Sequence, residues 1–156
     1  MAVYKRLKEF LVKNKIKYEA KRHKEVFTAQ EVAAVQHVSG DAMAKVVIVK
    51  SGNKMGMLVL PASHRVDFKK VKQVLGTGSV KLATEKEFKD AFPDCEVGAM
   101  PPFGSFYSIP VLADKALGKS ETIVFRAGSH KDTVKMKLGD YAKLEKPVVV
   151  DFSIHL

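Results

Sequence analysis

Two adjacent prolines, Pro101 and Pro102, impose the strictest local constraint on this chain. They remove two backbone donors and fix two φ angles, so the segment around them can be neither a helix interior nor a central strand. Gly98 and Gly104 flank the prolines, and a glycine lets the backbone turn sharply or approach a ligand closely. We therefore predict a stiff apolar loop, which forms either a fixed wall of a pocket or an ordinary surface connection.

The length of 156 residues fits one domain with a substantial core, and we expect a single domain over residues 1–156. No stretch of the sequence approaches the ~20 apolar residues of a membrane span. Residues 1–13 are charged and amphipathic, unlike a secretory signal. The single cysteine, Cys95, excludes an internal disulfide and suits a reducing compartment. We expect a cytoplasmic protein with no membrane partner.

The sequence carries 27 Lys and Arg residues against 17 Asp and Glu residues, a formal net charge of +10. The basic residues are spread along the chain, which favours a folded basic face over a disordered arm. Such a face predicts an anionic partner, and nucleic acid is the commonest one. The alternative is a lysine-rich solvated surface of the kind that thermophilic proteins also have.

Hydrophobic periodicity and turn residues predict intermingled helices and strands. Capping boxes begin helices at Thr28 with Glu31 and at Thr84 with Glu87, and Asp67 caps a third helix. Helices are expected over residues 3–13, 29–36, 68–75, 85 to about 91, and 140–144. Strands are expected over residues 16–23, 44–50, 55–60, 80–82, 109–113, 122–126, 133–137 and 148–152. The short connections favour a mixed α/β (α+β) fold, in which helices surround a mixed, partly barrel-like sheet.

Lys45 lies within the strand predicted over residues 44–50. Alternation places Lys45 on the same face as Val47 and Val49, and the opposite face is equally apolar, so both faces are expected to be buried. A lysine in that position either extends its ammonium group past the strand end into solvent or points into a pocket where its charge has a partner. Both interpretations remain open from the residues alone.

Conventional catalytic motifs are absent: the sequence has no Gly-rich phosphate-binding loop and no nucleophile elbow. The histidines show none of the close paired spacings of a zinc site, and one cysteine cannot supply further ligands, so we expect no metal and no other cofactor. The five histidines are His23, His37, His64, His130 and His155. Glu96 should raise the pKa of the Cys95 thiol, which favours a structural cysteine over a nucleophile.

Aromatic residues follow the prolines at Phe103, Phe106 and Tyr107. One of them could stack on an unpaired base, whereas core packing is the commoner role for each. His130 lies between two predicted strands and His23 at a strand end; each could face a site or could be solvated.

Six segments then occur in an order that is typical of one family. They are His23 ahead of Val26-Phe27-Thr28-Ala29-Gln30-Glu31, Ala44-Lys45-Val46-Val47, Leu60-Pro61-Ala62-Ser63-His64-Arg65-Val66-Asp67, Gly98-Ala99-Met100-Pro101-Pro102-Phe103-Gly104, Ile109-Pro110-Val111-Leu112-Ala113-Asp114, and Phe125-Arg126-Ala127-Gly128-Ser129-His130. On these segments the chain resembles the YbaK / prolyl-tRNA synthetase-associated family, the free-standing relatives of a synthetase editing domain. The Gly-x-x-Pro-Pro-Phe/Leu-Gly loop is the most specific of the six.

The resemblance implies a trans-acting enzyme that hydrolyses the ester of mischarged tRNA, with small amino acids such as Ala, Cys or Ser on a tRNA(Pro)-type or similar acceptor end. It implies that Lys45 holds the substrate near the scissile ester or terminal phosphate, and that Gly98 lies against the aminoacyl group. Substrate contacts are implied for His23, Thr28, Ala99, Met100, Pro101, Pro102, Phe103, Gly104, Gly128, Ser129 and His130. In the family scheme the terminal ribose hydroxyl helps to activate water, so neither a metal nor a triad is required.

The sequence contains no tRNA-anticodon module, so tRNA selection is expected from the acceptor end or from a synthetase partner. A second hypothesis is a non-catalytic tRNA- or nucleotide-binding module that recruits a synthetase. A third is a structural interaction protein, which would show no salt-dependent RNA binding.

Overall fold

The computed structural model describes residues 2–156 of the chain, and of Ala2 and Val3 it describes only the backbone. Its α-helices are α1 (Ala2–Lys13), α2 (Ala29–Gln36), α3 (Phe68–Leu75), α4 (Glu85–Lys89) and α5 (Leu138–Glu145), and its 3-10 helices are η1 (Gly104–Tyr107) and η2 (Lys115–Lys119). Its strands are β1 (Tyr18–Arg22), β2 (Ala44–Ser51), β3 (Lys54–Pro61), β4 (His64–Val66), β5 (Lys81–Leu82), β6 (Val111–Asp114), β7 (Thr122–Arg126), β8 (Asp132–Lys137), β9 (Val148–Val150) and β10 (Ser153–His155).

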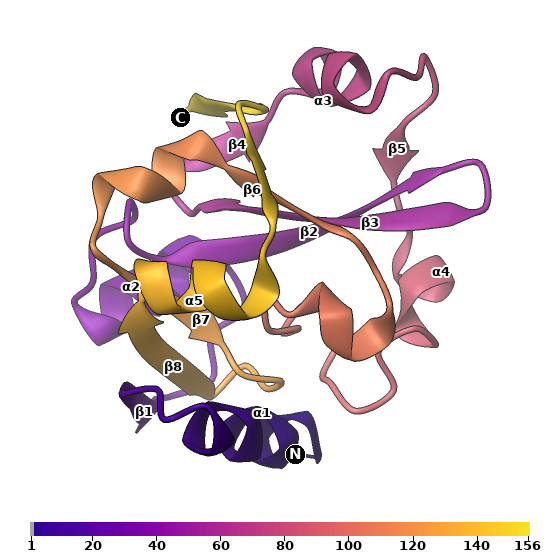
Figure 1. Cartoon of the computed structure of the whole chain (residues 1–156). Coiled ribbons are helices and arrows are strands. Elements are labelled where there is room, and N and C mark those ends of the chain that lie inside the picture. The colour runs from indigo at the N-terminus through magenta and orange to yellow at the C-terminus, as the bar shows by residue number, and fades with distance from the viewer. Residues whose placement is uncertain (1) are drawn as a thin grey trace.

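The strands form three sheets, and among the described residues none closes into a barrel. The largest sheet is mixed and has the order β5-β2-β3-β6-β9, with β3, β6 and β9 parallel. An antiparallel sheet has the order β1-β8-β7, and β10 pairs with β4. A parallel bridge from Met43 to Val124 joins the two larger sheets just before β2 begins. The predicted mixed α/β class is confirmed, and Figure 1 shows the helices around the sheets.

Local side-chain chemistry begins the helices where the sequence predicts it. The hydroxyls of Thr28 and Thr84 each accept a hydrogen bond from the N–H of the glutamate three residues later. The carboxylate of that glutamate accepts one from the N–H of the threonine, so both capping boxes are present. Asp67 caps α3, which ends at Gly76 in the left-handed region with a φ of 66°. The hairpin of β2 and β3 also forms as predicted, and Pro61 is its last paired residue.

Two strand predictions need correction, and two short strands are not predicted. The strand expected over residues 16–23 begins only at Tyr18, because α1 unwinds through Lys15 in the left-handed region with a φ of 57°. The strand expected over residues 148–152 ends at Val150, because the N–H of Phe152 donates to Asp114 and the chain turns there. Neither β4 nor β10 is predicted, because three residues are too few for alternation to be visible.

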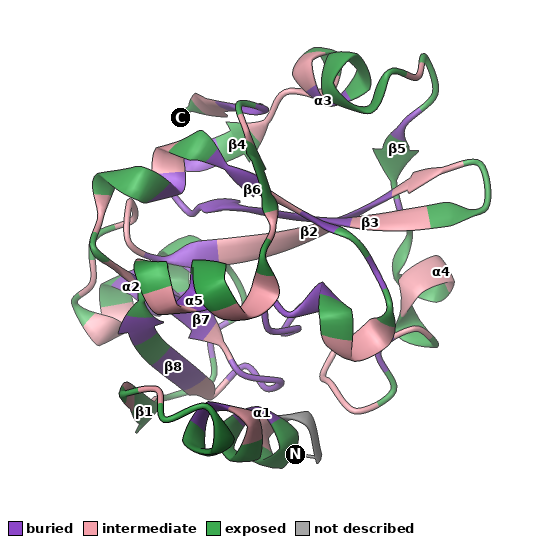
Figure 2. Ribbon diagram, in the orientation of Figure 1, coloured by how far each residue is buried: buried purple, intermediate pink, exposed green. Residues whose placement is uncertain are grey.

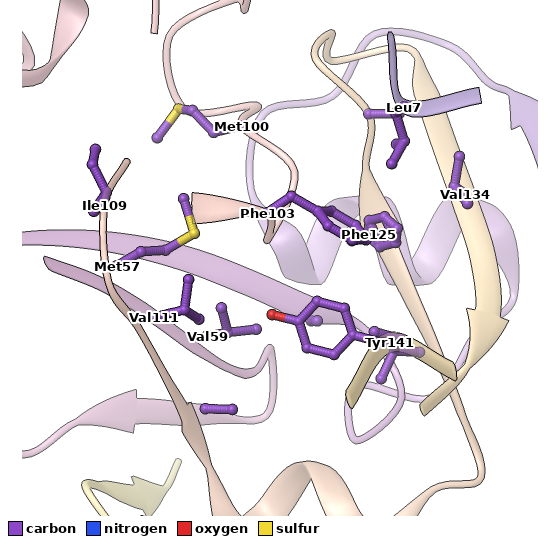
Figure 3. Packing of buried hydrophobic residues seen from close by; sticks show 14 of the residues in the cluster. Leu7, Met57, Val59, Met100, Phe103, Ile109, Val111, Phe125, Val134 and Tyr141 are labelled. Carbon is purple, nitrogen blue, oxygen red and sulfur yellow. The ribbon is translucent and has the colours of Figure 1, made fainter. Parts of the chain in front are cut away.

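The segment around the two prolines is buried. Pro101, Pro102 and Gly104 are buried residues, and Phe103 has an exposed fraction of 0%. The ring of Phe103 packs against Phe125 and Tyr141, with centroid distances of 5.7 and 5.4 Å (Figure 3). Further apolar clusters lie under α2 and between α3 and the largest sheet. Figure 2 shows that the turn between β7 and β8 is also buried.

The positive charge remains largely without ionic partners. Two ion pairs occur within residues 2–156, from Lys50 to Glu87 at 2.7 Å and from Lys70 to Asp151 at 3.1 Å. None of the helices in that range combines the length and the apolar character needed to cross a bilayer. Most of the lysine and arginine residues are exposed, so their charge can attract an anionic partner.

Gly104 should not tolerate a side chain. A Cβ at this position would lie 2.6 Å from Cγ2 of Val111 and would also overlap the backbone oxygen of Ile109. We expect Gly104→Ala to lower the free energy of unfolding by roughly 1–3 kcal/mol, measured by urea titration, because buried backbone must move. Gly139→Ala is the matched control, since no atom lies within 4 Å of a Cβ there. Equal stabilities of the two variants would contradict the packing described for the proline loop.

Candidate functional site

Two loops dock through their backbones beside the proline segment. The N–H of Glu96 donates to the oxygen of Gly128 at 2.8 Å, and the N–H of Gly128 donates to the oxygen of Ala99 at 2.9 Å. Gly98 and Gly128 have φ values of 84° and 96°, a region that strongly favours glycine. Residues 96–99 and 127–130 therefore form one rigid unit. Within residues 2–156 the N–H of Gly98 has no hydrogen-bond acceptor and is free to donate to a ligand.

His130 is held in this unit with one ring nitrogen unused. Its Nε2 lies 2.8 Å from the oxygen of Val97, and a carbonyl can only accept, so the proton must be on Nε2. Nδ1 is then an acceptor, and it is buried without a partner among the described residues. A Cβ on Gly98 would lie 3.7 Å from Cε1 of His130, so these two residues face each other.

His23 shows the same pattern beside the same turn. Its backbone N–H donates to the oxygen of Lys131 at 2.8 Å, and its Nδ1 donates to the oxygen of Lys24 at 2.6 Å. Nε2 is therefore an acceptor, and it too is buried with no partner in residues 2–156. An unpaired buried polar atom is costly. Two such imidazole nitrogens flanking one turn indicate a site for a hydrogen-bond donor.

Phe27 supplies an exposed aromatic surface next to His130. The residue before an N-cap often packs onto its own helix, yet 60% of Phe27 is exposed. Its ring centroid lies 4.9 Å from that of His130. The guanidinium of Arg126 donates to the backbone oxygen of Phe27 and holds this segment in place. Phe27 can therefore offer a stacking face to a planar group.

Lys45 and Arg126 are two half-buried cations on either side of the bridge that joins the two larger sheets. Each lies two residues beyond the parallel bridge between Met43 and Val124, so alternation places both side chains on the face of the bridge pair. Burial lowers the pKa of Lys45 and the pKa of Arg126. Neither forms an ion pair within residues 2–156. Two partly desolvated cations without a carboxylate predict an anionic ligand.

Several residues predicted to bind substrate have other uses. Thr28 caps α2. The hydroxyl of Ser129 donates to Asp132 at 2.7 Å and accepts two backbone N–H groups, so it shapes the turn that carries His130. The side chains of Met100 and Phe103 lie in the core, so they support the loop and do not face solvent.

The rest of the proline segment is likewise buried. Ala99, Pro101, Pro102 and Gly104 are buried, and the oxygen of Pro102 accepts the Tyr141 hydroxyl at 2.7 Å. The structure thus brings Gly98, Gly128, His130 and His23 together at the two docked loops. Phe27 and Arg126 carry no signal in the sequence as site residues, because only the fold reveals an exposed aromatic ring beside His130 and a half-buried cation without an acidic partner within residues 2–156.

Cys95 is a half-buried thiol that contacts Asp94 and Tyr107. Tyr107 donates to Asp94 at 2.8 Å, and its oxygen lies 3.2 Å from Sγ of Cys95. Burial, reinforced by Asp94, raises the pKa of the Cys95 thiol to about 12. Such a thiol is not a nucleophile near neutral pH, in agreement with the structural role expected for it.

With this geometry established, three comparisons with known proteins point in one direction. Residues 23–144 match the family model described as the aminoacyl-tRNA editing domain. A proline–tRNA ligase of Bacillus cereus is 33% identical over 88 residues, which make up 56% of this chain and 15% of the ligase. A proline–tRNA ligase 1 of Bacillus anthracis shows the same identity and coverage. The matched region is therefore a small part of these curated relatives.

Two solved structures share the fold. One is a hypothetical protein with a TM-score of 0.85 and 21% identity, covering 95% of this chain and 99% of its own. The other is a proposed trans-editing enzyme for prolyl tRNA synthetase, with a TM-score of 0.84 and 17% identity, covering 99% and 98%. At these identities the similarity establishes the fold alone.

Cys95 should resist thiol reagents in the folded protein. Because its pKa is about 12, we expect labelling by dithionitrobenzoate at pH 8 to be at least about 100-fold slower in native protein than in guanidinium chloride. The Cys95→Ala variant gives the background signal. Native labelling as fast as that of the unfolded chain would show that the thiol is accessible and ionised.

Proposed function

We propose a function from one premise: the chain belongs to the aminoacyl-tRNA editing domain family. In this proposal the protein is an aminoacyl-tRNA deacylase that acts in trans and clears mischarged tRNA. The observation that carries it is the pair of half-buried cations, Lys45 and Arg126, which lack acidic partners within residues 2–156. The acceptor end of tRNA supplies the phosphates that such a pair requires.

The reaction would be hydrolysis of the ester between the amino acid and the terminal ribose. Water adds to the ester carbonyl carbon, the carbon–oxygen bond to the ribose breaks, and the ribose oxygen takes up a proton, which leaves free amino acid and tRNA. The developing oxyanion would be stabilised by the free N–H of Gly98 and by the ammonium of Lys45. As the family resemblance implies, a neighbouring ribose hydroxyl would help to position the water.

The unused imidazole nitrogens would bind the amino acid. The α-ammonium group of an aminoacyl ester is a strong donor, and Nδ1 of His130 and Nε2 of His23 are buried acceptors. Phe27 would stack on the terminal adenine. The rigid turns at Gly98 and Gly128 suit a small pocket that admits Ala, Cys or Ser and excludes larger side chains by size.

The partner would be the acceptor end of a tRNA(Pro)-type or similar molecule. Relatives that match this chain are proline–tRNA ligases, and one solved neighbour is a proposed trans-editing enzyme for prolyl tRNA synthetase. These matches support a synthetase as a second partner and a cytoplasmic site of action. The second candidate, a tRNA-binding module that only recruits a synthetase, would use the same cations without turnover.

Removal of the Lys45 ammonium should abolish turnover. We expect Lys45→Ala to lower kcat/KM for deacylation by about 10²–10³-fold, because an oxyanion donor and a phosphate contact are lost together. The measurement is release of labelled amino acid from a panel of mischarged tRNAs, including Ala-, Cys- and Ser-tRNA(Pro). Lys50→Ala is the matched control, since Lys50 lies on the same strand but pairs with Glu87.

The same panel separates the two candidates. If no tRNA is deacylated by the wild type but salt-dependent tRNA binding persists and is weakened by Lys45→Ala, the recruiting module is correct and the deacylase is excluded. If Lys50→Ala lowers activity as much as Lys45→Ala, the effect is one of general charge and the assigned role of Lys45 fails.

His130→Gln tests the acceptor assigned to Nδ1. A glutamine amide can still donate to the oxygen of Val97 in place of Nε2 but offers no acceptor at the Nδ1 position. We expect KM to rise about tenfold with an unchanged melting temperature, because a hydrogen bond to the substrate ammonium is lost. His37→Asn serves as control, since asparagine also tolerates the left-handed conformation of that helix cap. An unaltered KM would remove His130 from the site.

A further inference from the structure

A second cluster of polar side chains lies outside the proposed catalytic site. It contains Asp41, from the turn before β2, His64, at the start of β4, and His155, at the end of β10. One ligand-capable atom of each lies within 4.8 Å of the others. The antiparallel pairing of β10 with β4 sets His155 directly opposite His64, and their ring centroids are 4.9 Å apart.

Hydrogen bonds orient both imidazoles in the same way. Nδ1 of His155 lies 2.9 Å from the backbone oxygen of Leu156, which can only accept, so the proton is on Nδ1 and Nε2 carries the lone pair. Nδ1 of His64 lies 3.0 Å from the hydroxyl of Ser153. Metal-bound histidines typically donate their second nitrogen to such an oxygen. In both residues Nε2 is the nitrogen left for a ligand.

His64 supplies an independent indication that something binds here. Only 6% of the residue is exposed, and its Nε2 is buried without a hydrogen-bond partner among the described residues. A purely structural histidine would have a donor for such a buried nitrogen. His64 instead lies beside another imidazole and a carboxylate, and its Nε2 is left to bind a ligand.

The carboxylate is held in place but retains a free oxygen. The hydroxyl of Ser63 donates to Oδ1 of Asp41 at 2.6 Å, and this hydrogen bond lowers the pKa of Asp41. Oδ2 makes no hydrogen bond within residues 2–156. Asp114 and Lys119 also act electrostatically on His64, and they are of opposite sign. Asp114 is already used as an N-cap and by the N–H of Phe152.

We propose that Asp41, His64 and His155 bind a divalent transition-metal ion, with Zn²⁺ as the best match. Two imidazoles and one carboxylate form a borderline donor set that suits Zn²⁺ and is too poor in oxygen for Mg²⁺ or Ca²⁺. Three protein ligands leave a fourth position for water. Donors about 2.1 Å from a tetrahedral zinc lie roughly 3.4 Å apart, so the longest separation in the cluster must shrink by up to about 1.4 Å. His155 is exposed and can move.

The ion would fasten the last strand to the body of the fold. β10 is three residues long, and within residues 2–156 its one partner strand is β4; such a short two-stranded unit is marginal alone. A metal shared by β4, β10 and the turn at Asp41 would link three segments that are distant in sequence. The spacing of the histidines gives no sign of this site, because its ligands meet only after the strands pair.

Zinc titration of the full-length chain tests the proposal. The protein is prepared without a histidine tag, stripped with EDTA, and titrated with ZnCl2 by calorimetry; Co²⁺ absorption reports the coordination geometry. We expect one Zn²⁺ per chain and a rise in melting temperature on its addition. His155→Gln and Asp41→Asn should each weaken zinc binding at least about tenfold. His155 and Asp41 are not core residues, so both variants should fold, and circular dichroism checks this.

His37→Asn is the matched histidine control and should bind zinc like the wild type, as should Lys45→Ala, which separates this site from the proposed deacylase. The absence of stoichiometric binding to the wild type would overturn the proposal. Wild-type zinc affinity in both His155→Gln and Asp41→Asn would also overturn it. A loss of zinc affinity in His37→Asn as large as in those two variants would do the same.

Discussion

The structure depends on burial of a loop that has few backbone donors to satisfy. A loop usually stays at the surface because its N–H groups need water. Pro101 and Pro102 have no N–H groups, the oxygen of Pro101 accepts the N–H of Phe103 at 2.8 Å, and the oxygen of Pro102 accepts the Tyr141 hydroxyl. The segment can therefore enter the core at little polar cost. Phe103 then occupies the centre of the aromatic cluster, and α5 is tied to the loop through Tyr141.

This burial fixes what lies on either side of the loop. Residues 96–99 precede the prolines and dock on residues 127–130 by backbone hydrogen bonds. The same β7 strand that leads into that turn is joined to the start of β2 through Met43 and Val124. Lys45, Gly98 and the neighbours Arg126 and His130 come from three separate parts of the sequence, yet all belong to segments that pack on the apolar core around the buried loop. A preorganised site of this kind needs little rearrangement to bind a ligand.

Most of the fold could be predicted from local sequence chemistry, and much less of the site could. Capping residues such as Thr28, Thr84 and Asp67 act within one helical turn, so their effect is readable from sequence. The roles of polar residues in motifs cannot be predicted in this way, because a motif does not reveal whether a polar atom already has a hydrogen-bond partner. The hydroxyl of Ser129, for example, is fully hydrogen-bonded within its own turn. The clusters that depend on strand pairing, such as Asp41 with His64 and His155, have no signal along the chain at all.

Several buried or half-buried polar groups have no partner within residues 2–156, which favours a ligand-binding protein over a purely structural one. A structural core satisfies its buried groups, and this chain does so along the proline loop and in the turn at Ser129. It does not do so at Lys45 and Arg126, or at the free nitrogens of His23 and His130. Desolvated cations and unpaired acceptors are each destabilising, so folding alone does not explain why this chain retains them. A ligand with both negative charge and a cationic donor meets both needs, and the aminoacyl end of tRNA has phosphates and an α-ammonium group within one small volume.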